Sequence, residues 1–141
     1  MEEASRRARV RNANRVKTYV LFIDLKKAFD KVPRRRLVEK LLLQGFRPSL
    51  VQTVHNILQG TQAEVDGETV NMDIGVPQGA VLSPTLFALY INDLITELNN
   101  NTTCYAFADD LVIVAKGEYF LDEAIRKIAR WSRVNGIEIN K

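Results

Sequence analysis

The chain has 141 residues, of which 46% are hydrophobic and 26% are charged, which suffices for one domain with its own core. No apolar run reaches the roughly 20 residues of a membrane-spanning helix, and the N-terminal segment lacks the apolar stretch of a signal peptide. A single cysteine and a single histidine exclude an internal disulfide and a Cys/His zinc site. We therefore expect an intracellular protein of a reducing compartment, cytoplasm or nucleus, without a membrane partner.

The net charge of +3 is unevenly distributed along the chain. Residues 1–17 contain six basic and two acidic side chains, a net charge of +4, which leaves −1 for the remainder. A basic segment before a near-neutral body suits a partner that carries phosphates. The alternative is a solvated helix or leader that binds nothing. The candidate nucleic-acid contacts are Arg6, Arg7, Arg9, Arg11, Arg15 and Lys17.

The first predicted elements are one strand and two helices. Residues 19–23 (YVLFI) form a continuous apolar run that ends at Asp24, and such a run predicts a strand buried on both faces. Leucines at a spacing of four predict a helix over 33–45, and a second apolar stripe predicts another over 48–60. Each helix is opened by a proline and closed by a glycine, as helix boundaries favour.

Two hairpins and two helices are expected in the second half. Alternating apolar and polar residues predict a hairpin over 63–76, turning at an Asp-Gly pair. Ser83 is expected to cap a helix that runs to residue 98. A second hairpin follows at 105–114 and a last helix at 124–136. The interleaved helices and hairpins predict an α+β fold, with helices packed on one face of an antiparallel sheet.

Aspartates break the local pattern in two places. Asp24 closes a strand of five apolar residues, and the adjacent Asp109 and Asp110 lie at a hairpin tip that has no glycine. Each alone is weak evidence, because exposed aspartates are common in turns and at strand ends. If both elements are neighbours in one sheet, however, three carboxylates meet at one edge. Their repulsion is relieved most simply by divalent cations, and paired metals can stabilise a phosphoryl transfer.

Three segments resemble successive motifs of reverse transcriptases, in the family's order. They are FIDLKKAFD (22–30), GVPQGAVLSPTLFALYINDL (75–94) and YAFADDLVIV (105–114). A fourth segment, NGIEINK (135–141), resembles the opening of the next motif. The Ala-Asp-Asp tip alone is a weak signal, whereas the second segment is long and specific. The resemblance covers the chain from Tyr19 onward and is closest to the polymerase palm of non-LTR, LINE-like retrotransposons.

The resemblance implies a metal site. Asp24 and Asp109 match the two carboxylates that hold metals in the family, and Asp110 matches a third that coordinates less directly. The main-chain carbonyl of Leu25 matches a ligand of the nucleotide-bound metal. The implied cofactor is a pair of Mg²⁺ ions, with Mn²⁺ as a substitute.

The resemblance also implies nucleotide contacts. Phe29 matches the aromatic residue that excludes a ribose 2′-hydroxyl, although packing in the core is its alternative role. Gln78 and Gly79 match the loop that lies against the incoming nucleotide and the template, where glycine permits close backbone approach. The implied partners are an RNA template, a DNA primer and a deoxynucleoside triphosphate.

The resemblance further implies a division of the chain. Residues 1–17 form a basic leader, interpreted as a remnant of the fingers region, and residues 18–141 form the palm core. The fourth motif is cut short and no thumb follows, so we expect the chain by itself to be inactive and to need the missing fingers and thumb regions. Lys141 is a candidate for the lysine that protonates pyrophosphate, with a position just beyond the chain as the alternative.

The expected function is that of an RNA-directed DNA polymerase that transfers a nucleotide to a primer 3′-hydroxyl with the help of two metals. One alternative is a degenerate retroelement fragment that binds nucleic acid without catalysis. Another is a phosphoacceptor signalling domain, which also gathers three aspartates at strand ends. That class has its acidic pair early and its single aspartate later, the reverse of the order found here.

Overall fold

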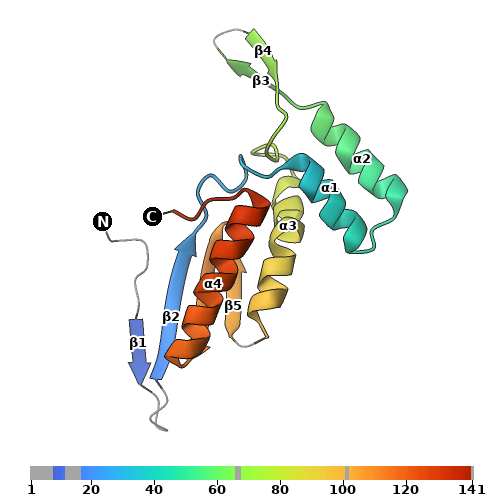
Figure 1. Ribbon diagram of the computed structural model, residues 1–141. Helices are drawn as coiled ribbons and strands as arrows, with labels where there is room; N and C mark the ends of the chain where they lie inside the picture. The colour runs from blue at the N-terminus through green and yellow to red at the C-terminus, as the bar shows by residue number, and fades with distance from the viewer. Residues whose placement is uncertain (1–7, 12–16, 66–67, 101, 141) are drawn as a thin grey trace. The chain divides into compact units, whose positions relative to one another are not determined.

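The computed structural model describes residues 8–11, 17–65, 68–100 and 102–140. The chain divides into two compact units. One contains the N-terminal part up to Lys26 together with the chain from Ile91 onward, and the other runs from Lys27 to Tyr90. Figure 1 shows the order of the elements. Within the described residues, no helix is both long and apolar enough to span a membrane.

The first unit is built on a four-stranded antiparallel sheet. Its strands lie in the order β1-β2-β6-β5. They span Ala8–Arg11 (β1), Lys17–Asp24 (β2), Thr103–Phe107 (β5) and Asp110–Lys116 (β6). The predicted strand before Asp24 and the second predicted hairpin are therefore confirmed, and they are neighbours in one sheet.

One face of this sheet is covered by helix α4 (Glu118–Asn135), which packs against β2 and β6 (Figure 1). Apolar side chains recur along α4 with helical spacing and form one buried stripe. Gly136 ends the helix in the left-handed conformation, at a φ of 73°. The buried side chains of this core include Leu21, Ile23, Leu111, Ile113, Leu121, Ala124, Ile128 and Trp131. The expected fold, α+β with helices on one face of an antiparallel sheet, is confirmed.

The prediction that the first apolar run is buried on both faces was wrong. Along β2, Tyr19, Leu21 and Ile23 are buried on the side of α4, whereas Phe22 on the opposite face is 48% exposed. Side chains alternate between the two faces of a strand, and among the described residues of this unit only the face toward α4 is covered by a helix. Both faces of β2 carry apolar residues, so the continuous apolar run did not reveal that one face is open.

The basic N-terminal segment contributes a strand. Arg9 and Arg11 belong to β1, which pairs with β2 at the edge of the sheet, and Lys17 begins β2 directly opposite Arg11. Arg6, Arg7 and Arg15 lie outside the described residues. The segment is thus joined to the sheet through its described part, while its origin as a remnant of a fingers region stays a prediction.

The second unit contains two helices and a small hairpin. The helices are α1 (Arg34–Leu43) and α2 (Pro48–Gln59), and the strands are β3 (Gln62–Val65) and β4 (Glu68–Asn71). The first half of α3 (Ser83–Leu98) also belongs to this unit, up to Tyr90. Both predicted helices are confirmed, with Gly45 in the left-handed conformation after α1.

The predicted hairpin over 63–76 is confirmed only in part, because β4 ends at Asn71. Beyond it the chain leaves β3 and follows the loop after β2. The N–H of Gly75 donates to the Val32 carbonyl at 2.8 Å, and the N–H of Val76 donates to the Phe29 carbonyl at 2.8 Å. Gly75 has a φ of 86°, and a Cβ there would lie 2.7 Å from a main-chain oxygen. The alternating pattern therefore extends beyond β4, into a segment whose main chain is hydrogen-bonded to the loop after β2 and not to β3.

A buried arginine holds this segment in place. Arg34 is only 3% exposed, and its Nε donates to the Gly75 carbonyl at 2.8 Å. Its Nη1 donates to the carbonyls of Leu58 and Met72. Burial lowers the pKa of Arg34, and the charge of Asp73 partly offsets that effect. One guanidinium thus joins α1 to the end of α2 and to the segment after β4.

Candidate active site

Asp24 and Asp110 lie directly opposite each other in the sheet. Asp24 is the last residue of β2, Asp110 is the first of β6, and the two are paired in the register of these strands. Directly opposite residues of an antiparallel pair have Cβ atoms about 4.5–5.5 Å apart and project from the same face. The pairing on which the predicted carboxylate site depends is therefore present.

Asp109 lies in the turn between β5 and β6, next to Asp110. The residue before it, Ala108, has a φ of 54°, a left-handed conformation that costs a non-glycine residue roughly 1–3 kcal/mol. Asp109 itself is half-buried. A strained turn without glycine thus places the Asp109 carboxylate next to the pair of Asp24 and Asp110. Such backbone strain is common at functional sites.

The segment after α4 lies against Asp24. Leu25 and Ile139 form an isolated antiparallel bridge. The N–H of Asn140 donates to the Asp24 main-chain carbonyl, and its Nδ2 donates to the Asp24 carboxylate, both at 2.8 Å. The segment that resembles the fourth motif is thus placed beside the first. Asn140 was not singled out from the sequence, where only its place in the fourth segment gave a signal.

Leu25 is buried, with 1% of its surface exposed. The two main-chain hydrogen bonds of its bridge are made by the residues on either side, Lys26 to Glu138 and Asn140 to Asp24. The carbonyl of Leu25 therefore takes no part in the bridge. Its role as a metal ligand stays a prediction.

Three exposed aromatic residues share the open face of the sheet with the carboxylate pair. Phe107 is the β5 partner of Asp110, and Tyr105 and Phe22 both pair with Val112. Tyr105 is 61% exposed and Phe107 is 83% exposed. Sequence reasoning missed these residues because it predicted Phe22 to be buried and assigned no role to Tyr105 or Phe107. The alternation of side chains along each strand was the signal that could have found them.

Phe29 lies in the second unit, half-buried. Its ring stacks on that of the buried Phe87, with 4.7 Å between the ring centroids and 29° between the planes. Such an offset stack contributes about 0.5–1.5 kcal/mol beyond the burial of area. The contact fits the alternative role of core packing, and the role in sugar selection stays a prediction.

Gln78 and Gly79 lie in an exposed loop of the same unit. The Nε2 of Gln78 donates to the carboxylate of Asp30 at 2.7 Å, a contact that the sequence did not reveal. Gly79 has a φ of 81°, and a Cβ added there would meet no atom within 4 Å. The backbone conformation therefore favours glycine at this position, while the space beside it is open. Contact with a nucleotide stays a prediction.

Among the described residues, no group of three or more His, Cys, Asp or Glu side chains is arranged to hold a metal ion. Asp24, Asp109 and Asp110 nevertheless supply carboxylate oxygens at one edge of the sheet, and oxygen ligands are those that Mg²⁺ prefers. The donor chemistry fits a divalent cation. That the three carboxylates together bind a cation stays a prediction. Lys141, the candidate for the lysine that protonates pyrophosphate, lies outside the described residues.

Comparison with known proteins decides the family. A family model described as "Reverse transcriptase (RNA-dependent DNA polymerase)" matches residues 2–141. The chain belongs to this reverse transcriptase family. A solved structure of the same fold is apo telomerase from Candida tropicalis, with a TM-score of 0.66 and 16% identity, matched over 87% of this chain and 29% of that one.

The curated relatives come from mobile elements. The Pol polyprotein from the type-2 retrotransposable element R2DM of Drosophila melanogaster is 29% identical over 136 residues, which are 86% of this chain and 13% of that protein. The RNA-directed DNA polymerase from mobile element jockey of the same species is 28% identical over 136 residues, 84% of this chain and 15% of that protein. The chain thus spans only a small part of the length of these relatives.

Proposed function

We propose that the chain is the catalytic palm of an RNA-directed DNA polymerase from a non-LTR retrotransposon. The observation that carries the proposal is the pairing of Asp24 with Asp110, beside the strained turn of Asp109. It occurs in a chain that the family model matches over residues 2–141. One relative is named an RNA-directed DNA polymerase, and the same reaction is proposed here.

The three aspartates are proposed to hold two Mg²⁺ ions, which Mn²⁺ can replace. Asp24 and Asp109 would supply the main ligands, with Asp110 and the Leu25 carbonyl assisting. Carboxylates of like charge repel one another, and a bound divalent cation relieves that repulsion. When bound, the cations would neutralise the charge on the phosphates during transfer to the primer 3′-hydroxyl. The hydrogen bond from Asn140 would keep the Asp24 carboxylate oriented toward its ligand position.

The open face of the sheet is proposed to support the primer and the RNA template. Phe22, Tyr105 and Phe107 expose aromatic surface beside the carboxylates. Nucleic-acid bases and sugars pack on such surface without much regard to sequence, which suits a polymerase that copies any template. Phosphoryl transfer depends mainly on positioning and on charge neutralisation, and this face would contribute the positioning.

Phe29 is proposed to select deoxynucleoside triphosphates. A ring excludes a 2′-hydroxyl only if it cannot move aside, and the stack on Phe87 holds the ring of Phe29. Gln78 and Gly79 are proposed to lie against the incoming nucleotide, with the hydrogen bond to Asp30 ordering the loop. Packing and selection are thus compatible roles for Phe29.

Other regions of a parent polyprotein, fingers and thumb, are proposed to complete the enzyme, because a primer–template must be held on several sides. An intracellular setting, nucleus or cytoplasm, is proposed as well. The free Cys104 is buried in the first unit, and burial raises the pKa of its thiol. A reducing compartment suits such a cysteine.

The experiment is primer extension by the chain within its full reading frame, with an annealed DNA primer on an RNA template. We expect extension that requires the template, deoxynucleoside triphosphates and Mg²⁺ or Mn²⁺, and that stops with a chelator. The alternative of a degenerate fragment predicts that the primer–template is bound but not extended under any of these conditions.

A further inference from the structure

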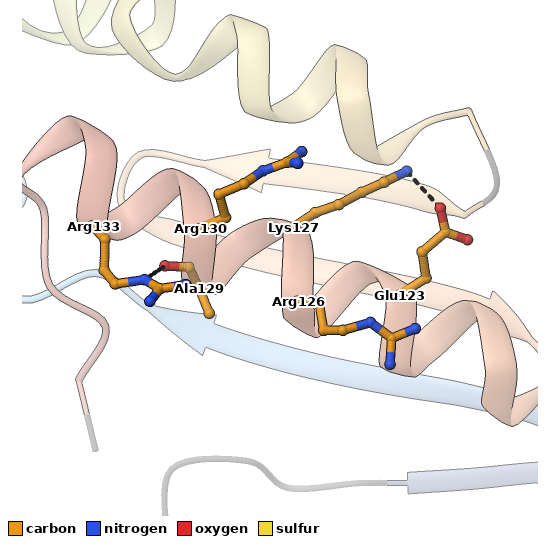
Figure 2. A pocket seen from close by; sticks show the side chains of 6 residues that line it. All are labelled: Glu123, Arg126, Lys127, Ala129, Arg130 and Arg133. Atoms are coloured by element: carbon orange, nitrogen blue, oxygen red, sulfur yellow. Dashed lines mark hydrogen bonds and ion pairs between the residues drawn. The ribbon is translucent and has the colours of Figure 1, made fainter.

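The outward side of α4 carries a basic groove. It has a volume of about 510 Å³ and is lined by Arg126, Lys127, Arg130 and Arg133, together with Glu123 and Ala129 (Figure 2). We call this surface the α4 groove. All its residues belong to the first unit, and none of them takes part in the proposed active site.

Helix geometry places the arginines together on the outward side. An α-helix turns about 100° per residue, so Arg126, Arg130 and Arg133 lie within an arc of about 60°. The buried stripe of α4, with Leu121, Ala124, Ile128, Trp131 and Asn135, lies on the opposite side. From Arg126 to Arg133 the helix rises roughly 10 Å. The arginines thus form one short stripe along the axis of α4.

Two of the cations in the groove pair with carboxylates, whereas the other two have no such partner among the described residues. Lys127 pairs with Glu123 at 3.1 Å, and Arg130 pairs with Glu97 of α3. In the part of the chain that the structure describes, Arg126 and Arg133 have no carboxylate partner, and the Nε of Arg133 donates to a main-chain carbonyl at 3.3 Å. Two guanidinium groups therefore remain to bind an external anion (Figure 2).

The helix dipole does not account for this stripe. Cations are favoured in the last turn of a helix, where the carbonyl groups carry partial negative charge. Of the residues in the last turn of α4, only Arg133 is basic. Arg126 and Arg130 lie further from the C-terminus, where the effect has faded. The dipole therefore does not explain the positions of Arg126 and Arg130.

We propose that the α4 groove binds the phosphate backbone of single-stranded RNA, at a site separate from the active site. The guanidinium group matches phosphate with two parallel hydrogen bonds. Arg126 and Arg133 are separated by roughly 10 Å along the helix axis, so each can contact a different phosphate of one strand. The choice of RNA rests on the proposed function, in which an RNA template is the polyanion that the enzyme copies.

The two sites are on opposite sides of the sheet. α4 covers the face formed by Leu21, Ile23 and their neighbours, whereas Asp24 and Asp110 project from the open face. RNA in the α4 groove would therefore leave the open face free. A strand held there would remain attached to the enzyme while another stretch is copied.

The test measures binding of a short fluorescein-labelled oligouridylate to the chain by fluorescence anisotropy, over a range of salt concentrations. The variant is Arg126→Gln with Arg133→Gln. The matched control is Arg35→Gln with Arg47→Gln, which removes the same charge from two exposed residues of the second unit. The logarithm of the binding constant falls linearly with the logarithm of the salt concentration, and each phosphate contact to a single strand adds about 0.7 to this salt slope. We therefore expect the salt slope to fall by about 1.4 in the groove variant. At 0.1 M salt this corresponds to roughly 25-fold weaker binding.

A second variant, Arg126→Lys with Arg133→Lys, keeps the charge and should keep the salt slope, and circular dichroism checks that all variants fold. Equal affinity and slope in the groove variant and the control would overturn the proposal. Binding of this RNA is measured without primer, nucleotide or divalent cation, so it does not depend on polymerisation. Equal RNA binding by the groove variant and the control, with intact primer extension by the wild type, would count against this proposal alone. Weaker RNA binding by the groove variant, with no primer extension by the wild type, would count against the proposed function alone.

Discussion

Asp24 faces Asp110 directly across the ladder of β2 and β6, so two like charges share one end of a strand pair. Like charges in this position destabilise a sheet by up to about 1 kcal/mol. We therefore expect Asp110→Asn to raise the melting temperature of the chain in a chelator, as measured by circular dichroism. Added Mg²⁺ or Mn²⁺ should raise the melting temperature of the wild type. The difference in melting temperature between Asp110→Asn and the wild type should then become smaller.

The control for this prediction is Asp122→Asn, which neutralises an exposed aspartate of α4. It should leave the melting temperature nearly unchanged with and without the cation. If Asp110→Asn lowers the melting temperature in the chelator, repulsion across the ladder is not the dominant effect at this pair.

Arg34 supports the second unit from within. Arg34→Met should lower the free energy of unfolding by roughly 2–5 kcal/mol, because it leaves buried main-chain carbonyls without donors. Its neighbour Arg35 has a side chain that is 94% exposed, and Arg35→Met should change stability by no more than about 0.5 kcal/mol. Chemical denaturation measures both. Equal effects would show that the carbonyl contacts of Arg34 are not stabilising.

Phe29→Val should relax sugar selection in the polymerase. A smaller side chain leaves room for a 2′-hydroxyl, and the loss of one steric contact is worth roughly 10-fold or more in discrimination. The measurement is the ratio of kcat/KM for matched deoxy- and ribonucleotides. Phe120→Val is the control, since Phe120 is also half-buried and contacts another ring. An unchanged ratio in Phe29→Val would leave only the packing role on Phe87.

Cys104 should react slowly with thiol reagents in the folded chain. It is buried, and burial raises its pKa above the ordinary value, so little of the reactive thiolate forms. Because the pKa is higher in the folded than in the unfolded chain, the free energy of unfolding should fall as pH rises above the unfolded value. The rates of thiol labelling with and without denaturant test the slow reaction of Cys104 in the folded chain. Equal rates would contradict the burial of the thiol.

Local signals in the sequence predicted the elements that begin and end at special residues. The prolines that open α1 and α2 and the glycines that follow these helices were sufficient, because their backbone preferences act within a few residues. The strand before Asp24 and the hairpin of Asp109 were predicted from their apolar runs, which are also local signals. The sequence did not show that these two elements are neighbours in one sheet, because strand order depends on contacts between residues distant in sequence.

Other features could not be read from local patterns. Phe22 looked like a core residue, because an apolar run does not reveal which face of a sheet stays open. Arg34 was not singled out from the sequence, because its acceptors are carbonyls from distant segments. Asn140 looked unremarkable until its hydrogen bond to Asp24 was seen. In each case the partner is remote in sequence, and its position is set by packing.

We propose that the aspartates at the end of β2 and in the turn before β6 hold the metals of a polymerase. The most direct test is primer extension on an RNA template by the chain in its full reading frame, comparing wild type, Asp109→Asn and the control Asp122→Asn. The substitution at Asp109 keeps the volume and removes a charge that the cations need. We expect extension by the wild type and the control, and none by Asp109→Asn with its fold intact. Template-dependent extension by Asp109→Asn at the wild-type rate would contradict the account.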